Sequence, residues 1–266
     1  MLQLRTHQVD YDSRADVFHL WHLTDTHLGS RACDEAALRR DIARVADDPF
    51  AYWVFGGDWC EFINPTDRRF DPAEVADWIR VRDLADIAKV QSDHAITLFR
   101  PIATPDKCLG AIGGNHGLTI LNEFHHDPHA YICGELNIPN LGYDGAFINL
   151  RFKRAGGSIR SYRIALLHGW GGGRQPGGKM NKLRDALAAY DADVILLGHL
   201  HVRYRLAAMT YSCTKHRIVT KKRLAVIGGA YLDGAGYAVR AGYPPAELGG
   251  VMISITPDKN IIECLL

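Results

Sequence analysis

The sequence lacks an excess of charge of either sign and lacks any long hydrophobic segment. It contains 31 Lys and Arg residues against 30 Asp and Glu residues, and its formal net charge is +1. This balance excludes the strong positive field of a histone-like nucleic-acid binder. No apolar run approaches the roughly 20 residues that cross a bilayer, and residues 1–16 carry charges where an export signal has an apolar core. We therefore expect a soluble protein that has no membrane partner.

Cysteine is also scarce, and no two cysteines form a Cys-x-x-Cys pair. The six cysteines are spread along the chain, unlike the dense framework of a small secreted protein or the pairs of a zinc ribbon. We expect reduced, mostly buried thiols and a cytoplasmic location. With 266 residues, 47% of them apolar, and no internal repeat or linker, the chain is expected to form a single domain over residues 1–266.

The sequence does have a recurring pattern in which a short apolar run ends in a polar side chain. Five such runs, over residues 17–23, 52–55, 109–112, 164–167 and 194–197, are typical of buried β-strands. Each is followed by Asp, Asn or His. The polar segments are, in chain order, Thr24-Asp25-Thr26-His27, Gly56-Gly57-Asp58, Gly113-Gly114-Asn115-His116, His168-Gly169 and Gly198-His199-Leu200-His201.

Helical patterns lie between these strands, over residues 34–46, 72–90 and 179–190. The alternation of strand and helix predicts α/β layering in the first two-thirds of the chain. After His201 the pattern changes to strand-like runs, which predict a second sheet formed late in the sequence. These runs cover residues 202–209, 216–220, 224–229, 251–255 and 261–265.

The polar residues at the strand ends form a suitable set of metal ligands. Divalent cations of hard or borderline character bind carboxylate oxygen, amide oxygen and imidazole nitrogen. A two-metal hydrolase needs several such groups around its two ions. Each short motif alone would be weak evidence, but five in order are specific. The candidate ligands are Asp25, His27, Asp58, Asn115, His168, His199 and His201.

In order and spacing, the motifs D-x-H, G-G-D, G-N-H, H-G and G-H-x-H resemble those of the calcineurin-like metallophosphoesterases, including phage and bacterial members and relatives among protein phosphatases and DNA-repair nucleases. The resemblance covers residues 23–201 and implies a four-layer α/β/β/α sandwich. It also implies two divalent metal ions bridged by Asp58. The resemblance assigns Asp25, His27 and His201 to one ion and Asn115, His168 and His199 to the other.

The chemistry implied by the resemblance is hydrolysis of a P–O ester bond by a hydroxide that bridges the two metals. Mn²⁺ is our first choice, and Fe, Zn²⁺, Co²⁺ and Ni²⁺ also suit these ligands. His116 would protonate the leaving alkoxide as general acid. Glu61 stands where the related G-D-x-x-D pattern has Asp, and we expect it to be the partner of His116. Gly117 departs from the pattern, because the family usually has Glu or Asp after G-N-H.

Two features bear on the substrate. The Asp-Arg-Gly signature of protein phosphatases is missing, and basic residues gather near residues 151–163 and 215–223. Both observations favour a phosphodiesterase that acts on nucleotides or nucleic acid, such as a nuclease. In the glycine-rich segment 168–178, Arg174 could bind a phosphate oxygen, and Trp170 could stack on a base or simply pack. A phosphomonoesterase or protein phosphatase is the alternative enzyme. A metal-binding scaffold with little catalysis is the alternative of another class, and we predict no protein partner for the enzyme.

Overall fold

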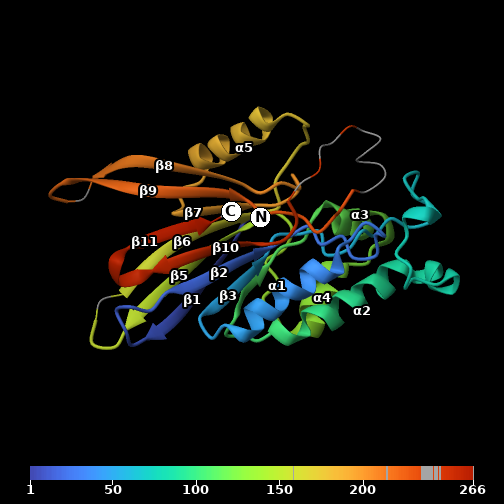
Figure 1. Cartoon of the computed structure of the whole chain (residues 1–266), viewed down its shortest axis with the longest axis horizontal. Coiled ribbons are helices and arrows are strands. Elements are labelled where there is room, and N and C mark those ends of the chain that lie inside the picture. Colours follow the sequence, from blue (N-terminus) through green and yellow to red (C-terminus); the bar gives the residue numbers. More distant parts are fainter. Residues whose placement is uncertain (158, 214, 235–241, 243–244, 246, 266) are drawn as a thin grey trace.

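The computed structural model describes residues 1–157, 159–213, 215–234, 242, 245 and 247–265, and these form a mixed α/β fold with two sheets (Figure 1). One sheet, here named the β2 sheet, has the strand order β11-β10-β2-β3-β4. Its strands are β2 (Phe18–Leu23), β3 (Ala51–Phe55), β4 (Cys108–Ala111), β10 (Val251–Thr256) and β11 (Ile261–Leu265). The neighbours β2, β3 and β4 are parallel, so their carboxyl ends meet at one edge.

The second sheet, here named the β6 sheet, has the order β1-β5-β6-β7-β9-β8. Its strands are β1 (Gln3–Tyr11), β5 (Ala146–Arg154), β6 (Ile159–Leu167), β7 (Val194–Leu197), β8 (Tyr204–Cys213) and β9 (Ile218–Ile227). Here β6, β7 and β9 are parallel. The loops that follow the parallel strands of both sheets gather on the same side of the molecule, at the right in Figure 1.

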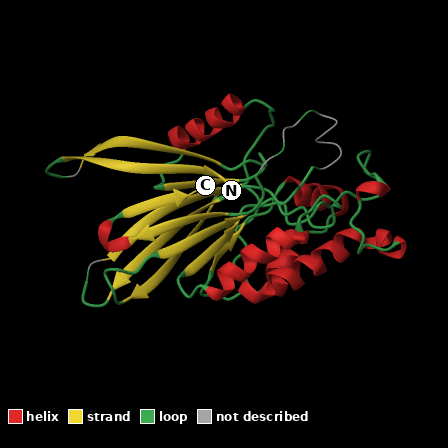
Figure 2. Ribbon diagram, viewed as in Figure 1, coloured by secondary structure: helices red, strands yellow, loops and turns green. Residues whose placement is uncertain are grey.

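Alternation along the strands divides the apolar residues between separate cores. In β3, Val54 belongs to a core that joins the two sheets, whereas Trp53 and Phe55 face the opposite way. Trp53 and Phe55 pack in a core with residues of α1 (Glu35–Asp47), α2 (Ile87–Phe99) and α4 (Pro128–Leu136). A third core joins the β6 sheet to α5 (Pro176–Ala189). Figure 2 accordingly shows α5 on one side of the strands and the other long helices on the opposite side.

The five predicted strands are confirmed as β2, β3, β4, β6 and β7, and two of the predicted helices as α1 and α5. The prediction of one helix over residues 72–90 is wrong. That stretch contains two 3-10 helices, η1 (Pro72–Glu74) and η2 (Val81–Asp86), and only the first residues of α2. The Asp86 carboxylate accepts a hydrogen bond from the Lys89 amide and caps a new helix there, which explains the interruption.

The prediction of a separate late sheet is also wrong. β8 and β9 extend the β6 sheet, whereas β10 and β11 extend the β2 sheet. The runs 216–220 and 224–229 belong largely to one strand, β9. The pattern also missed β1 and β5, in which polar and apolar residues are mixed. It missed two helices as well: α3 (Asn115–Phe124), which begins within the G-N-H motif, and α4, which follows α3.

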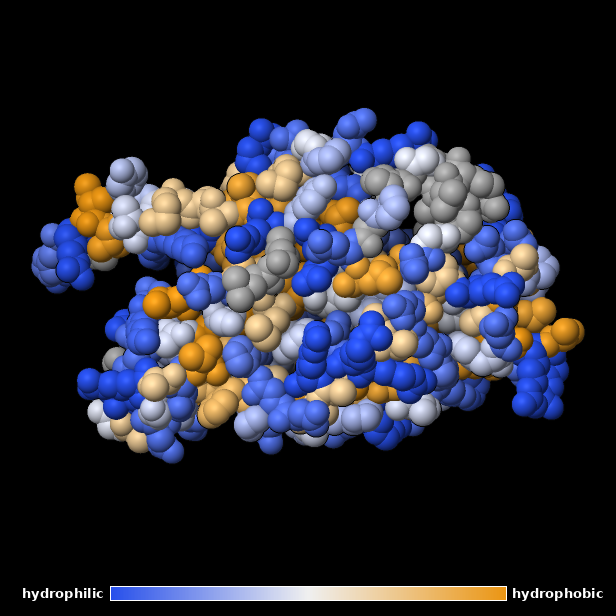
Figure 3. All heavy atoms as spheres, in the orientation of Figure 1, coloured by the Kyte–Doolittle hydropathy of each residue, from blue (hydrophilic) through white to orange (hydrophobic). Residues whose placement is uncertain are grey.

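The hairpin of β8 and β9 projects beyond the body of the molecule, at the left in Figure 3. Near its tip Met209, Tyr211 and Ile218 are largely exposed. Within the described part of the chain, no helix combines the length and apolar character needed to cross a membrane. Four of the six cysteines are buried, which confirms the prediction of mostly buried thiols; Cys33 is half-buried and Cys213 is exposed.

Candidate metal centre

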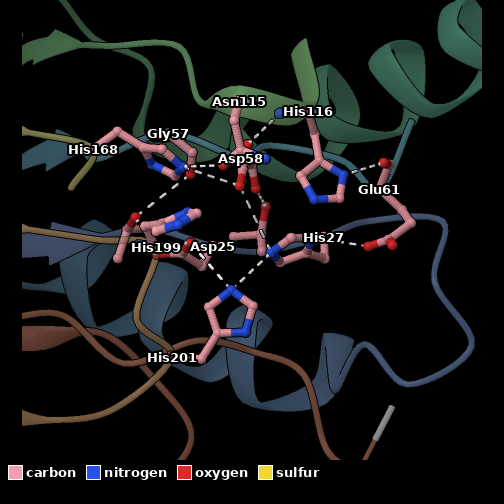
Figure 4. Close-up of polar contacts among 12 residues, drawn as sticks. Asp25, His27, Gly57, Asp58, Glu61, Asn115, His116, His168, His199 and His201 are labelled. Atoms are coloured by element: carbon pink, nitrogen blue, oxygen red, sulfur yellow. Dashed lines mark hydrogen bonds and ion pairs between the residues drawn. The ribbon is translucent and has the colours of Figure 1, made fainter. Parts of the chain in front are cut away.

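The structure brings the seven predicted ligands together at the carboxyl ends of the parallel strands (Figure 4). Asp25 and His27 follow β2, Asp58 follows β3, and Asn115 is the first residue of α3, just after β4. The remaining three follow strands of the other sheet: His168 follows β6, and His199 and His201 follow β7. Both sheets therefore contribute donors to one site.

Most of these ligands have an unusual backbone conformation. Left-handed backbone is uncommon outside glycine, because the side chain crowds the following carbonyl group. Among the described residues nine that are not glycine have positive φ, and five of the nine are predicted ligands. These five are Asp25 (φ 52°), His27 (φ 44°), Asp58 (φ 54°), His199 (φ 66°) and His201 (φ 49°). Strain of this kind concentrates at functional sites, where it aims side chains that an extended strand would point elsewhere.

Backbone hydrogen bonds join the loops that follow β2 and β3. The Asp25 amide donates to the Gly57 carbonyl at 2.9 Å, and the Thr26 amide donates to the Asp58 carbonyl at 3.0 Å. The close approach of a third loop requires glycine, since a Cβ atom on Gly114 would lie 2.1 Å from Oδ1 of Asp58. The glycines of the predicted motifs thus allow the ligand loops to pack against each other.

The first donor cluster consists of Asp25, His27 and His201. The Nε2 atoms of His27 and His201 lie 3.1 Å apart, and Nε2 of His201 is 3.4 Å from Oδ1 of Asp25. On the other side of its ring, Nδ1 of His27 lies 2.8 Å from the Glu61 carboxylate, which accepts a hydrogen bond from it. That bond leaves Nε2 of His27 as a lone-pair donor directed at the cluster, as a metal ligand requires.

The second donor cluster consists of Asp58, His168 and His199. The His168 ring donates from Nδ1 to the Gly56 carbonyl at 2.8 Å, so Nε2 faces the cluster. This Nε2 lies 3.1 Å from Oδ2 of Asp58 and 3.0 Å from Oδ1 of Asn115. Three acceptors this close together favour a positive charge among them, either a proton or a metal ion.

The charges of the site agree with this conclusion. Burial alone would lower the pKa of His168, but the neighbouring Asp58 carboxylate outweighs it and raises that pKa to about 9. Burial opposes ionisation of Asp25, yet the hydrogen bond from His201 and the charges nearby lower its pKa to about 2. The pKa of Asp58 is lowered well below its usual range, mainly by His168 against the effect of burial. Ionised carboxylates among imidazoles make a donor set that suits divalent cations.

Asp58 lies between the two clusters. Its Oδ2 atom is 3.1 Å from Nε2 of His168 and 4.0 Å from Nε2 of His27. Its Oδ1 atom accepts the His116 amide at 3.0 Å, at the amino end of α3, where the helix dipole favours negative charge. The Asp58 carboxylate therefore faces an imidazole of each cluster.

The predicted pairing of Glu61 with His116 needs correction. The Glu61 carboxylate bonds to His27, while it is the Glu61 carbonyl oxygen that accepts from Nδ1 of His116. Burial would lower the pKa of His116, but Asp58, Glu61 and this carbonyl together raise it. A sequence motif identifies the residue at a position but does not tell whether its side chain or its backbone makes the contact.

The remaining predicted residues lie outside the two clusters. Trp170 is 41% exposed, and the ammonium group of Lys182 lies 5.9 Å from its ring centroid. Arg174 is exposed in the loop before α5 and bonds to none of the clustered side chains that the structure describes. A Cβ on Gly117 would meet Tyr143 and Pro128 at ordinary distances, so the position tolerates a side chain but faces these neighbours.

Sequence reasoning missed two contributors to the site. The Thr24 hydroxyl donates to Oδ2 of Asp25 at 2.6 Å, and the His199 amide donates to both oxygens of the same carboxylate at 2.9 Å. The polar residue directly before D-x-H could have suggested Thr24. The amide contact has no signal in the sequence, because any residue supplies an amide.

Comparisons with known proteins give fold-level matches only. No family model matches the chain, and no curated protein matches it. A conserved uncharacterised protein of Streptococcus pneumoniae TIGR4, named as a predicted phosphoesterase, matches 90% of this chain and 84% of its own at 12% identity and a TM-score of 0.35.

Two structures of Vps29 match over a similar range. Vps29 of Entamoeba histolytica, in complex with Zn²⁺, matches 93% of this chain and 97% of its own at 11% identity and a TM-score of 0.40. Vps29 of Chaetomium thermophilum matches the same shares at 12% identity and a TM-score of 0.39. Similarity at this level does not show that the proteins share a function. The chemistry of this chain is therefore inferred from its own side chains.

Proposed function

We propose that the chain is a dinuclear metal-dependent phosphoesterase of the calcineurin-like type, formed by one domain. The main support for this proposal is the position of Asp58 between two donor clusters. A pair of adjacent cations requires a carboxylate that both can share. The three apolar cores support the corresponding four-layer α/β/β/α arrangement.

The donor set fits two divalent cations. Asp25, His27 and His201 would hold one ion. Asn115, His168 and His199 would hold the other, with Asp58 shared. When bound, such cations polarise the phosphate ester and make water a competent nucleophile near neutral pH. Mn²⁺ is the ion we propose first, and Fe, Zn²⁺, Co²⁺ and Ni²⁺ are chemically suitable.

His116 is proposed as the general acid. Its Nδ1–H is fixed by the Glu61 carbonyl, which orients the ring and leaves Nε2 to carry the transferable proton. The raised pKa of His116 keeps more of this proton in place near neutral pH. Glu61 has a positioning role, since its carboxylate orients His27 and its carbonyl orients His116.

For the substrate we favour a phosphodiester of a nucleotide or nucleic acid over a phosphoprotein. The missing Asp-Arg-Gly signature supports this preference. Arg174 and Trp170 remain candidates for substrate contact at the glycine-rich segment. A cytoplasmic location also remains a proposal.

The test is turnover of bis(p-nitrophenyl) phosphate and p-nitrophenyl phosphate with added Mn²⁺. We expect metal-dependent release of nitrophenolate, faster from the diester. Replacement His116→Ala should lower hydrolysis of an alkyl phosphate ester by about 10²–10⁴-fold, because its alkoxide needs the proton donor. The same replacement should affect the nitrophenyl esters much less, since nitrophenolate departs without a proton. His126→Ala is the matched control, since His126 is exposed and outside the donor clusters.

Two outcomes would contradict the proposal. If neither ester is hydrolysed with any of the five metals while the protein binds the ion, the chain is a metal-binding scaffold. If Asp58→Asn leaves metal binding unchanged in calorimetry, the dinuclear centre itself is wrong.

A further inference from the structure

A cavity of about 530 Å³ lies directly beside His116 and is here named the His116 pocket. One wall comes from Gly29, Ser30 and Glu61 of the ligand loops, and Ile87 and Gln91 of α2 form another. Residues of the segment 68–75 line the remainder, and this segment includes the start of the predicted helix 72–90. The volume falls within the range of about 300–1,000 Å³ that is usual for small-molecule sites.

The pocket adjoins the proposed general acid. His116 lines it, and His116 is the residue proposed to protonate the leaving oxygen. In the hydrolysis, water loses a proton to the solvent and forms the new P–O bond, while the ester P–O bond breaks with its electrons on the leaving oxygen. That oxygen takes a proton from His116, which solvent then restores. The alcohol so formed must occupy space next to His116.

The lining has a strong apolar component. Ile63, Phe70 and Val75 contribute apolar side chains, and Ile87 is buried at the base of the first turn of α2. An apolar wall with an aromatic ring favours a flat, weakly hydrated group over a fully hydrated one. This composition fits the ring of a nucleoside base better than an unmodified sugar or a peptide hydroxyl.

The charged groups of the lining argue against an anionic leaving group. Three carboxylates, from Glu61, Asp71 and Glu74, face two guanidinium groups. Arg69 is already paired with Asp67 at 2.7 Å, so its charge is compensated. The Arg68 guanidinium has no partner among the described residues, and its planar face can stack on an aromatic ring. The Glu61 carboxylate is likewise paired with His27, so two further lining carboxylates stand against the Arg68 guanidinium. A leaving strand with further phosphates would meet this small excess of negative charge.

We infer that the His116 pocket binds the leaving alcohol of the substrate and fits an uncharged, nucleoside-sized group with a flat ring. This inference rests on the proposed phosphoesterase function and narrows it to phosphate esters of small nucleosides. It favours such esters over polymeric nucleic acid and over phosphoproteins.

The test begins with binding, which does not require turnover. Adenosine is titrated into the full-length, EDTA-treated protein, and binding is followed by calorimetry and by ligand-detected NMR. Val75→Trp fills the pocket and should weaken adenosine binding by about tenfold or more. Val81→Trp is the matched control, because Val81 is 86% exposed and does not line the pocket.

A second variant guards against misfolding of the first. Phe70→Ala removes the ring and should also weaken adenosine binding about tenfold, since stacking on an aromatic side chain contributes this much per base. Circular dichroism and thermal melting establish that each variant is folded. Adenosine binding that is absent in the wild type, or unchanged in both pocket variants, would overturn the inference.

The same variants separate this inference from the proposed function. With Mn²⁺, Val75→Trp should lower kcat/KM for nucleoside esters far more than for p-nitrophenyl phosphate, whose leaving group is smaller. Equal losses on both substrates would reject the leaving-group role while the phosphoesterase stands. Adenosine binding without any ester turnover would reject the phosphoesterase and leave only a nucleoside site. A short oligonucleotide that binds the pocket more tightly than adenosine would reject the preference for an uncharged group.

Discussion

At the scale of single residues, the site depends on partners that fix the orientation of each imidazole. Glu61 holds His27 through Nδ1, and the Gly56 carbonyl holds His168 in the same way. Each bond decides which ring nitrogen carries the proton and which remains free for a cation. The sequence predicts the histidines but not these partners, because a backbone carbonyl has no residue identity.

Replacement of Glu61 tests this arrangement. Glu61→Ala should weaken Mn²⁺ binding by about 10–100-fold, because His27 loses the acceptor that orients it. Glu61→Gln should weaken Mn²⁺ binding less, since its amide oxygen can still accept a hydrogen bond from Nδ1 of His27. Isothermal titration with Mn²⁺ measures both, with Glu123→Ala, on an exposed position of α3, as the control. Equal affinity in all four proteins would refute the positioning role.

A second residue-scale prediction concerns His129. This side chain is buried in α4, and its Nδ1 accepts the Trp59 indole N–H at 3.1 Å. Burial lowers the pKa of His129 from 6.5 to about 4. Between pH 6.5 and about pH 4, His129 is protonated in the unfolded chain but neutral in the folded protein. The free energy of unfolding therefore falls as the pH falls.

Because of His129, the free energy of unfolding should fall by about 2 kcal/mol when the pH is lowered from about 7.5 to about 5. His129→Gln keeps an acceptor for Trp59 but cannot titrate, so its stability should depend less on pH. Urea unfolding at the two pH values measures the difference, and His126→Gln is the exposed control. A variant with the same pH dependence as the wild type would show that His129 is not the acid-sensitive group.

At the scale of elements, the strands were the predictable part of the fold. A strand buried on both faces, such as β3 or β7, is a continuous apolar run and is visible in the sequence. Edge strands such as β1 alternate exposed and covered residues and resemble a polar loop. Which sheet β8 to β11 would join was not predictable, because pairing depends on contacts distant in sequence.

The helix cap of α4 provides a prediction at this scale. The Asp127 carboxylate accepts from the Ala130 amide at 2.9 Å and from the Tyr143 hydroxyl at 2.7 Å. Asp127→Ala removes both acceptors and should lower the free energy of unfolding by about 1–2 kcal/mol. Asp127→Asn keeps a side-chain oxygen that caps the helix equally well, so its free energy of unfolding should fall much less. Denaturant unfolding of the two variants decides, and similar losses would contradict the capping role.

At the scale of the whole molecule, the candidate metal centre connects two sheets that otherwise meet through one apolar core. Asp25, Asp58 and Asn115 follow strands of the β2 sheet, whereas His168 and His199 follow strands of the β6 sheet. Bound cations would therefore cross-link the two sheets. A ligand that binds only the folded state stabilises it by mass action.

Metal removal should lower the melting temperature of the full chain. With free Mn²⁺ at about 100 times its Kd, the added stability is about 2.7 kcal/mol. For a chain of this size that corresponds to roughly 5–10 °C. Differential scanning calorimetry with Mn²⁺ and with EDTA measures the shift. Asp58→Asn should show little or no difference between the two conditions, and a full shift in that variant would place the stabilising ion elsewhere.

The left-handed backbone at the ligands sets a limit on engineering this protein. Glycine adopts that conformation without steric cost, so substitutions such as His201→Gly would relieve strain while removing a donor. A mutant library screened for thermostability alone would accumulate glycine or asparagine at these positions. The selected variants would be more stable but would no longer bind the metal ions. Selection should therefore score thermostability and ion uptake together.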